Sequence, residues 1–220
     1  MGELAHGIDP GVLHRVAAEI AQLHADGVQL GVVIGGGNIY RGSALAQAGM
    51  DRVTGDYMGM LATVMNALAM GDALQRQGVD AQVLSAIALT PAAETYSPYR
   101  ARDQLAAGRV VLLSAGTGNP YFTTDTGAAL RAVEIQAEAM VKATKVDGVY
   151  NADPATDPQA VKYARLSYDE VLARQLAVMD LTALVLCRDH GMPLQVINMT
   201  RPGEMRRAAL GEPVGTVIHR

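Results

Sequence analysis

The sequence predicts an α/β protein, a three-layer α/β/α sandwich with a mostly parallel central sheet. Helical and strand-like segments alternate along the chain, which is typical of parallel sheets whose strands are connected by helices. Several strand candidates are apolar on both faces, as strands covered by helices must be. The chain has 220 residues and half of them are apolar, so it can bury a large core. We therefore expect a single domain over residues 1–220.

The first elements follow from capping and periodicity. Asp9 is expected to cap a helix whose first residue is Pro10, and this helix should continue to Gly27. Residues 28–34 are rich in β-branched side chains and end beside glycines, which predicts a buried strand. The apolar face of the helix consists of Val12, Val16, Ile20 and Leu23.

The longest helical pattern lies at 57–77 and is apolar nearly all round over its first half. Such a helix is buried in a core or against another subunit, and burial in a monomer core is the commoner case. The alternation then continues with a strand-like segment at 80–87, a helical segment at 98–108 and a strand at 109–114.

The second half of the chain repeats the alternation. Asp125 is expected to cap a helix over 125–137, and a strand follows at 138–144. Nearer the C-terminus the sequence predicts helices at 168–177 and 180–191 and strands at 194–198 and 215–219.

Composition excludes several classes of protein. The formal net charge is −4, and no basic cluster is larger than Arg206-Arg207, so we expect no nucleic-acid partner. The single cysteine, Cys187, lies in an apolar context, which favours a buried core residue and a reducing compartment over a disulfide framework. No secretory signal or apolar run of about 18 residues is evident, so we expect a cytoplasmic protein without a membrane partner.

Polar loops follow three of the strand candidates, at 35–42, 115–125 and 145–154. Loops at the carboxyl ends of parallel strands gather along one edge of the sheet, where ligands bind. The glycines at 35–37 would let the backbone approach an anion, and Arg41 could add a charged fork for phosphate. The structural alternatives are a flexible turn for the glycines and a surface cation for Arg41.

Known short motifs leave the chemistry open. The chain contains neither a P-loop nor a clean dinucleotide-binding G-x-G-x-x-G at the start of a helix. Its five histidines show no metal-ligand spacing, so we assign no metal site within the protein. A Ser/His/Asp arrangement cannot be inferred either, and hydrolysis by a protein nucleophile therefore has no support.

Four charged residues have both a structural and a functional reading. Asp56 could be the N-cap of the long apolar helix or an acceptor for ribose hydroxyls. Asp153 precedes a proline and could be a turn former, and Asp180 could be only a helix cap. Lys142 lies inside an apolar strand candidate, so its ammonium group needs a partner or an exit to a cleft.

Five segments stand out along the chain, in this order: GVVIGGGNIYRG (31–42), GDYMGMLATVMNALAM (55–70), SAGTGNPYFTTD (114–125), KATKVDGVYNADP (142–154) and VMD (178–180). In these segments the sequence resembles the bacterial uridylate (UMP) kinase family within the amino-acid-kinase fold. The resemblance runs from about Gly7 to the C-terminus, and five motifs in this order make coincidence very improbable.

The resemblance implies transfer of the γ-phosphoryl group of Mg-ATP to UMP, giving UDP and ADP in pyrimidine nucleotide biosynthesis. Mg²⁺ would act as the cofactor together with ATP. By the same resemblance Gly36 would contact UMP and Asp56 would hold its ribose. The uridylate loop would comprise Thr117, Gly118, Asn119, Pro120, Tyr121, Phe122, Thr123 and Thr124.

For ATP, the resemblance assigns Gly37 and Arg41 to the phosphates. It assigns Thr144, Tyr150 and Asp153 to the rest of the ATP pocket. Asp180 would organise the catalytic centre, with Arg41 and Lys142 as further catalytic candidates that neutralise charge. The family also implies a homohexamer, activation by GTP and inhibition by UTP.

One family feature has no clear counterpart. Uridylate kinases begin with a strand bearing Lys-x-Ser-Gly-Glu, and here only Gly2-Glu3 corresponds to its end. A chain that truly lacked this lysine is expected to lose most of its activity. Two alternatives therefore stay open: a nucleotide- or oxyanion-binding protein of this fold without turnover, and a sister kinase acting on a carboxylate or carbamate. The GTGNPYFTTD loop weighs against the second.

Overall fold

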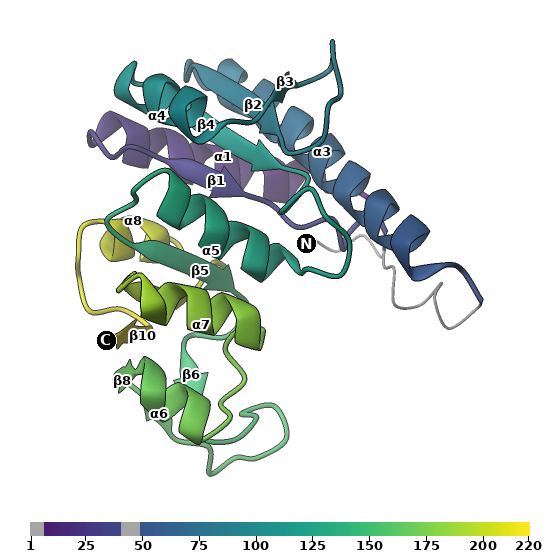
Figure 1. Ribbon diagram of the computed structural model, residues 1–220. Coiled ribbons are helices and arrows are strands. Elements are labelled where there is room, and N and C mark those ends of the chain that lie inside the picture. Colours follow the sequence, from purple (N-terminus) through teal and green to yellow (C-terminus); the bar gives the residue numbers. More distant parts are fainter. Residues whose placement is uncertain (1–6, 41–48) are drawn as a thin grey trace. The chain divides into compact units, whose positions relative to one another are not determined.

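The computed structural model describes residues 7–40 and 49–220. The chain divides into two compact units, Met1–Arg131 and Ala132–Arg220. Each unit contains strands and helices, so the predicted α/β class is confirmed (Figure 1). The expectation that residues 1–220 form a single domain stays a prediction.

The first unit is built on a parallel sheet with the strand order β1-β4-β2-β3. Its strands are β1 (Gly31–Val33), β2 (Ala81–Ser85), β3 (Glu94–Thr95) and β4 (Val110–Ser114). Every residue of β4 is buried, and this strand pairs in parallel with β1 on one side and β2 on the other. Burial on both faces explains why 110–113 is a continuous apolar run rather than an alternating one.

Three helices of this unit are α1 (Pro10–Ala25), α3 (Arg52–Arg76) and α4 (Pro98–Ala106). Figure 1 shows α3 beside α1, and α3 also contacts β2 and β4. Apolar side chains of α1 and α3 form one core cluster with the central strand, and its members include Ala17, Ile20, Ala67, Met70, Leu74, Val110 and Leu112. Asp9 caps α1, as predicted, by accepting from the backbone N–H groups of Gly11 and Val12.

The second unit has a four-stranded sheet with the order β5-β9-β10-β8. β5 (Met140–Thr144) and β9 (Leu194–Asn198) are parallel, whereas β9 and β10 (Thr216–His219) are antiparallel. β8 (Arg165–Ser167) pairs in parallel with β10, so the sheet is mostly parallel. A separate antiparallel ribbon joins β6 (Val149–Tyr150) and β7 (Lys162–Tyr163).

Helices of the second unit are α6 (Tyr168–Ala173), α7 (Leu181–Asp189) and α8 (Glu204–Ala209), and α5 (Thr124–Glu134) runs across the boundary between the units. Asp180 caps α7, because its Oδ1 accepts from the Ala183 N–H at 3.1 Å. Cys187 of α7 is buried, as its apolar context predicted, and burial raises the pKa of its thiol.

Two helix starts differ from those predicted. α3 begins at Arg52 and is capped by Asp51, which accepts from the Thr54 N–H at 2.9 Å, so the N-cap reading of Asp56 is wrong. The first turn of α3 is polar, and the apolar pattern that predicted the helix begins only after it. α5 begins at Thr124, and Thr123 Oγ1 accepts from the Thr126 N–H, so Asp125 is a residue of the first turn and not the cap.

Several short elements have no counterpart in the prediction. They are β3, β6, β7, β8 and α8. Each has two to six residues, which is too short for a hydrophobic period to be read. Among the helices of residues 7–40 and 49–220, none has the length and apolar character needed to cross a membrane.

Candidate functional site

The glycine loop that follows β1 is held by a buried side chain of α3. Asn66 Nδ2 donates to the Gly35 carbonyl at 2.7 Å. The same amide pairs with the amide of Asn38 in both directions, at 2.7 and 3.0 Å. A buried amide must satisfy its donors and acceptor, so Asn66 fixes both the path of the loop and its distance from the helix.

The loop that follows β4 is held by the same helix. Thr63 Oγ1 accepts from the Ala115 N–H at 2.8 Å and donates to the Met60 carbonyl at 2.7 Å. Ala115 is fully buried and follows Ser114, the last residue of β4 that pairs with β2, so its N–H needs this partner. α3 therefore brings the loops after β1 and β4 together.

Gly36 is required by packing. A Cβ at this position would lie 2.7 Å from the Gly59 carbonyl oxygen and 2.8 Å from Ala62 Cβ. The glycine loop therefore approaches the backbone of α3 more closely than any side chain allows. The flexible-turn alternative therefore does not account for Gly36, which close packing against α3 requires.

The two loops and the first turns of α3 enclose a cavity of about 330 Å³. Its lining includes eight residues that the sequence assigned to ligands: Gly36, Gly37, Asp56, Thr117, Asn119, Phe122, Thr123 and Thr124. The lining also includes residues that sequence reasoning missed: Tyr40, Arg52, Gly55, Gly59, Met60, Thr63 and Gly116. Gly118, Pro120 and Tyr121 belong to the same loop but do not line this cavity.

Asp56 joins the start of α3 to the 117–124 loop. Its carboxylate accepts from Arg52 Nε at 2.8 and 2.9 Å and from the Tyr121 N–H at 2.7 Å. The Arg52 guanidinium carbon lies 5.7 Å from the centroid of the Tyr121 ring, within the range of a cation–π contact. The i,i+4 spacing of Arg52 and Asp56 was a signal in the sequence that could have found this pair.

In the second unit, the predicted catalytic residues Lys142 and Asp180 belong to neighbouring segments. Lys142 Nζ donates to the Val178 carbonyl at 2.8 Å, two residues before Asp180 in the chain. The lysine in the apolar strand thus has the polar partner that its position required. The cap reading of Asp180 is confirmed by its bond to Ala183, and the catalytic roles of both residues stay predictions.

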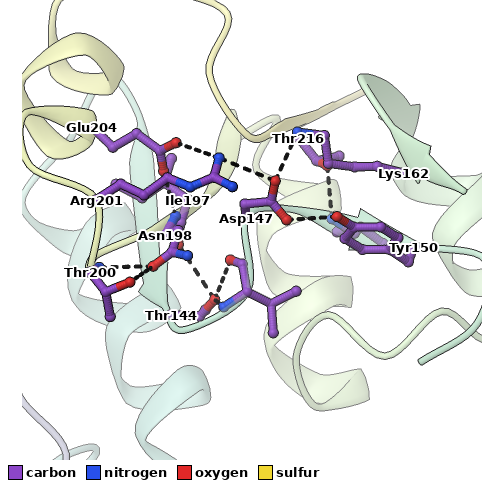
Figure 2. Close-up of polar contacts among 12 residues, drawn as sticks. Thr144, Asp147, Tyr150, Lys162, Ile197, Asn198, Thr200, Arg201, Glu204 and Thr216 are labelled. Atoms are coloured by element: carbon purple, nitrogen blue, oxygen red, sulfur yellow. Dashed lines mark hydrogen bonds and ion pairs between the residues drawn. The ribbon is translucent and has the colours of Figure 1, made fainter. Parts of the chain in front are cut away.

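Figure 2 shows a cluster of polar side chains around Asp147, at the carboxyl ends of β5 and β9. Asp147 accepts from the Tyr150 hydroxyl at 2.7 Å and forms ion pairs with Arg201 at 3.3 Å and Lys162 at 3.4 Å. The Tyr150 hydroxyl holds the pKa of the Asp147 carboxyl below its usual value, and the two cations act in the same direction. Glu204 also pairs with Arg201 at 3.4 Å.

The other predicted ATP-pocket residues shape their own loop. Thr144 Oγ1 accepts from the Val146 N–H at 2.9 Å and donates to the Val146 carbonyl at 2.7 Å. Asp153 Oδ1 accepts from the Ala155 N–H at 2.9 Å, which is the bond of a turn former. The structure therefore supports the turn reading of Asp153, while its role toward ATP stays a prediction. Arg41 lies outside the described residues.

The chain belongs to the amino acid kinase family, because the sequence model of that family matches residues 2–198. Among curated proteins, it is 60% identical over 218 residues to the uridylate kinase of Stutzerimonas stutzeri (strain A1501). The alignment covers 99% of this chain and 88% of that protein. The uridylate kinase of Pseudomonas aeruginosa (strain PAO1) is 59% identical, with 99% and 89% covered.

Solved structures lead to the same family. The UMP kinase of Bacillus anthracis matches with a TM-score of 0.96 and 36% identity, covering 99% of this chain and 90% of that chain. The UMP kinase of Ureaplasma parvum matches with a TM-score of 0.94 and 34% identity, covering 100% and 94%. Within the amino acid kinases the chain is thus a member of the uridylate kinase family, and the resemblance inferred from the five motifs is confirmed.

Thr63 offers a test of how α3 holds the loop after β4. Thr63→Val keeps the branched shape but removes the acceptor of the buried Ala115 N–H, so we expect a loss of about 1–3 kcal/mol in the free energy of unfolding. Urea unfolding followed by circular dichroism measures it. Thr63→Ser keeps the hydroxyl and should lose clearly less than the valine variant. Equal losses in the two variants would contradict the role of the hydrogen bond.

Asp147 offers a test by pH. Its pKa is lowered in the folded chain relative to an unfolded value of about 3.9. The stabilisation by the ionised carboxylate is therefore complete above about pH 4 and is lost as the pH falls through the folded pKa. Asp147→Asn should be less stable than the parent at pH 7, and this deficit should shrink toward zero in acid. Urea unfolding at several pH values measures it.

Asp169→Asn is the matched control for this series, because the Asp169 side chain is 85% exposed and its one ion pair, to Arg188, is long at 3.7 Å. It should show almost no deficit at any pH. A deficit of Asp147→Asn that stayed constant from pH 7 into acid would contradict the electrostatic origin.

Proposed function

We propose that the chain transfers the γ-phosphoryl group of Mg-ATP to UMP, giving UDP and ADP. The observation that carries the proposal is the cavity of the first unit, where the GGG loop, Asp56 and the 117–124 loop meet. Its volume of about 330 Å³ falls at the lower end of the range for small-ligand sites. Proteins named uridylate kinase that are about 60% identical to this chain support the choice of UMP.

In this proposal the cavity holds UMP. Gly36 would present its backbone to the phosphate, and Asp56 would accept from a ribose hydroxyl. Thr123 and Thr124 would offer hydroxyl donors, and Thr117, Asn119 and Phe122 would surround the nucleoside. Gly118, Pro120 and Tyr121 would shape the loop that carries them. Phosphoryl transfer depends mainly on positioning and on stabilising the charge of the moving group, so a site made of backbone, hydroxyl groups and cations suits the reaction.

The ATP side of the proposal uses the second unit. Thr144, Tyr150 and Asp153 would line the ATP pocket, while Gly37 and Arg41 would contact its phosphates. Asp180 would organise the reacting groups, and Lys142 would help to neutralise charge.

Magnesium would shield the negative charge of the transferred group. The residues that the structure describes contain no group of three or more His, Cys, Asp or Glu side chains that could hold a metal ion. Mg²⁺ in kinases commonly takes most of its ligands from substrate phosphates and water. An ion that arrives with ATP would therefore be held mainly by the phosphates and by water.

We further propose that the protein acts in the cytoplasm as a homohexamer activated by GTP and inhibited by UTP. One face of α3 exposes the large apolar side chains Tyr57, Met58, Leu61, Met65 and Leu68. Exposed apolar groups on one helix are typical of a contact surface, which supports self-association through α3. The one buried cysteine agrees with a reducing compartment.

The proposed reaction is tested by coupled detection of ADP in the presence of UMP and Mg-ATP. We expect ADP to form in proportion to UMP and to be absent without it. Protein of verified intact mass should be used. Nucleotide binding without turnover would instead identify a binding protein of this fold, and turnover with a carboxylate or carbamate in place of UMP would identify a sister kinase.

Asn119 tests which nucleotide the 117–124 loop contacts. Asn119 lines the cavity, and among residues 7–40 and 49–220 its hydrogen bonds to Thr117 involve only its backbone. Removal of its side-chain amide should therefore leave the loop in place. Asn119→Ala is expected to raise the KM for UMP about tenfold, the scale of one lost hydrogen bond to a ligand. The KM for ATP should stay within about twofold. Steady-state kinetics with each substrate varied in turn measures both, and equal changes would contradict the assignment.

A further inference from the structure

Arg52 occupies an electrostatically unfavourable position in α3. It is the first residue of the helix, where the partial positive charge of the helix end disfavours a cation. Its pair with Asp56 also has the basic residue on the N-terminal side, which is the weaker order for an i,i+4 ion pair. Helix stability therefore does not explain Arg52, and residues that break a local rule in this way are often functional.

A second pair on the same helix shows what an ordinary ion pair looks like. Asp72 and Arg76 have the same i,i+4 spacing in the favoured order, with 2.7 Å between Arg76 NH2 and Asp72 Oδ2. The Asp72 side chain is 62% exposed, and the pair lies outside the cavity. The Asp56 side chain is only 18% exposed, and both Arg52 and Asp56 line the cavity.

The hydrogen bonds of Asp56 leave it one well-defined acceptor site. A carboxylate has about four acceptor positions on its two oxygens. Oδ2 accepts from Arg52 Nε and from the Tyr121 N–H, whereas Oδ1 accepts from Arg52 Nε alone among the described residues. The χ2 angle of an aspartate is otherwise broad and roughly two-fold, so its two oxygens can exchange places. These bonds fix the χ2 angle of Asp56 and thereby decide which oxygen faces the loop and which can receive a ligand.

We propose that Arg52 is a positioning residue that orients Asp56 so that its Oδ1 accepts a sugar hydroxyl of the bound nucleoside monophosphate. The proposal rests on the proposed function, which makes UMP the ligand of this cavity. Arg52 acts on UMP through Asp56 and, by its contact with the Tyr121 ring, keeps the backbone N–H of that residue on Oδ2. Tyr121 has a φ of 72°, an uncommon conformation that a packed partner helps to hold.

The test is a double-mutant cycle of UMP binding, measured by isothermal titration calorimetry without ATP. Arg52→Gln should weaken the Kd for UMP about tenfold, on the scale of a hydrogen bond to a charged group. Asp56→Asn should weaken it at least as much. The double variant should bind no more than about twofold more weakly than Asp56→Asn alone, because Arg52 has nothing left to orient.

Two controls make the cycle specific. Arg76→Gln breaks the exposed pair of the same helix and should leave the Kd for UMP within about twofold of the parent. Arg52→Lys keeps the charge but lacks the planar Nε–H group, so its affinity should lie between those of the parent and the glutamine variant. Thermal unfolding should give nearly the same Tm for all single arginine variants.

Other results would overturn the proposal. An unchanged Kd for Arg52→Gln would show that Asp56 needs no orientation, and losses that multiply in the double variant would mean that Arg52 contacts UMP independently. If the parent protein binds UMP without producing ADP, the proposed kinase reaction fails while the cycle still decides the role of Arg52. If the parent does not bind UMP at all, both proposals fall.

Discussion

The structure of the first unit depends on two buried polar side chains of α3. Strands β1 and β4 end with backbone groups that no neighbouring strand can pair, and an unpaired buried group costs about 1–3 kcal/mol. Asn66 satisfies the Gly35 carbonyl and Thr63 satisfies the Ala115 N–H. One helix face thereby sets the position of both loops, and the same helix carries Asp56 into the space between them.

In the second unit a charged centre holds the loop that follows β5. Asp147 draws a tyrosine hydroxyl and two cations together at the carboxyl ends of β5 and β9, and Thr216 Oγ1 accepts from the Val149 N–H in the adjoining ribbon. These contacts order the loop that carries the proposed ATP-pocket residues. In each unit, buried or half-buried polar groups hold the loops at strand ends. Ligands of parallel sheets bind at these ends.

Function and local stability conflict at the start of α3. Asp51 caps the helix and satisfies its first N–H groups, but the next residue is an arginine in the field of the helix end. The chain tolerates this cation because Asp56, four residues on, neutralises it at 2.8 Å. The same contact holds the 117–124 loop through Tyr121. An arrangement that is poor for an isolated helix thus joins the start of α3 to a loop distant in the chain, and positions that break local rules in this way are often functional.

The sequence by itself determined the long elements, two helix caps and the family, because hydrophobic period, capping residues and motif order are local properties of the chain. Eight of the residues that it assigned to ligands line the cavity. Only the tertiary structure decided the start of α3, the antiparallel pairing of β9 with β10, and the contacts of Thr63 and Asp56. These features depend on partners distant in the chain: 52 residues separate Thr63 from Ala115, and 65 separate Asp56 from Tyr121. No local pattern encodes contacts that form only when helix and sheet pack together.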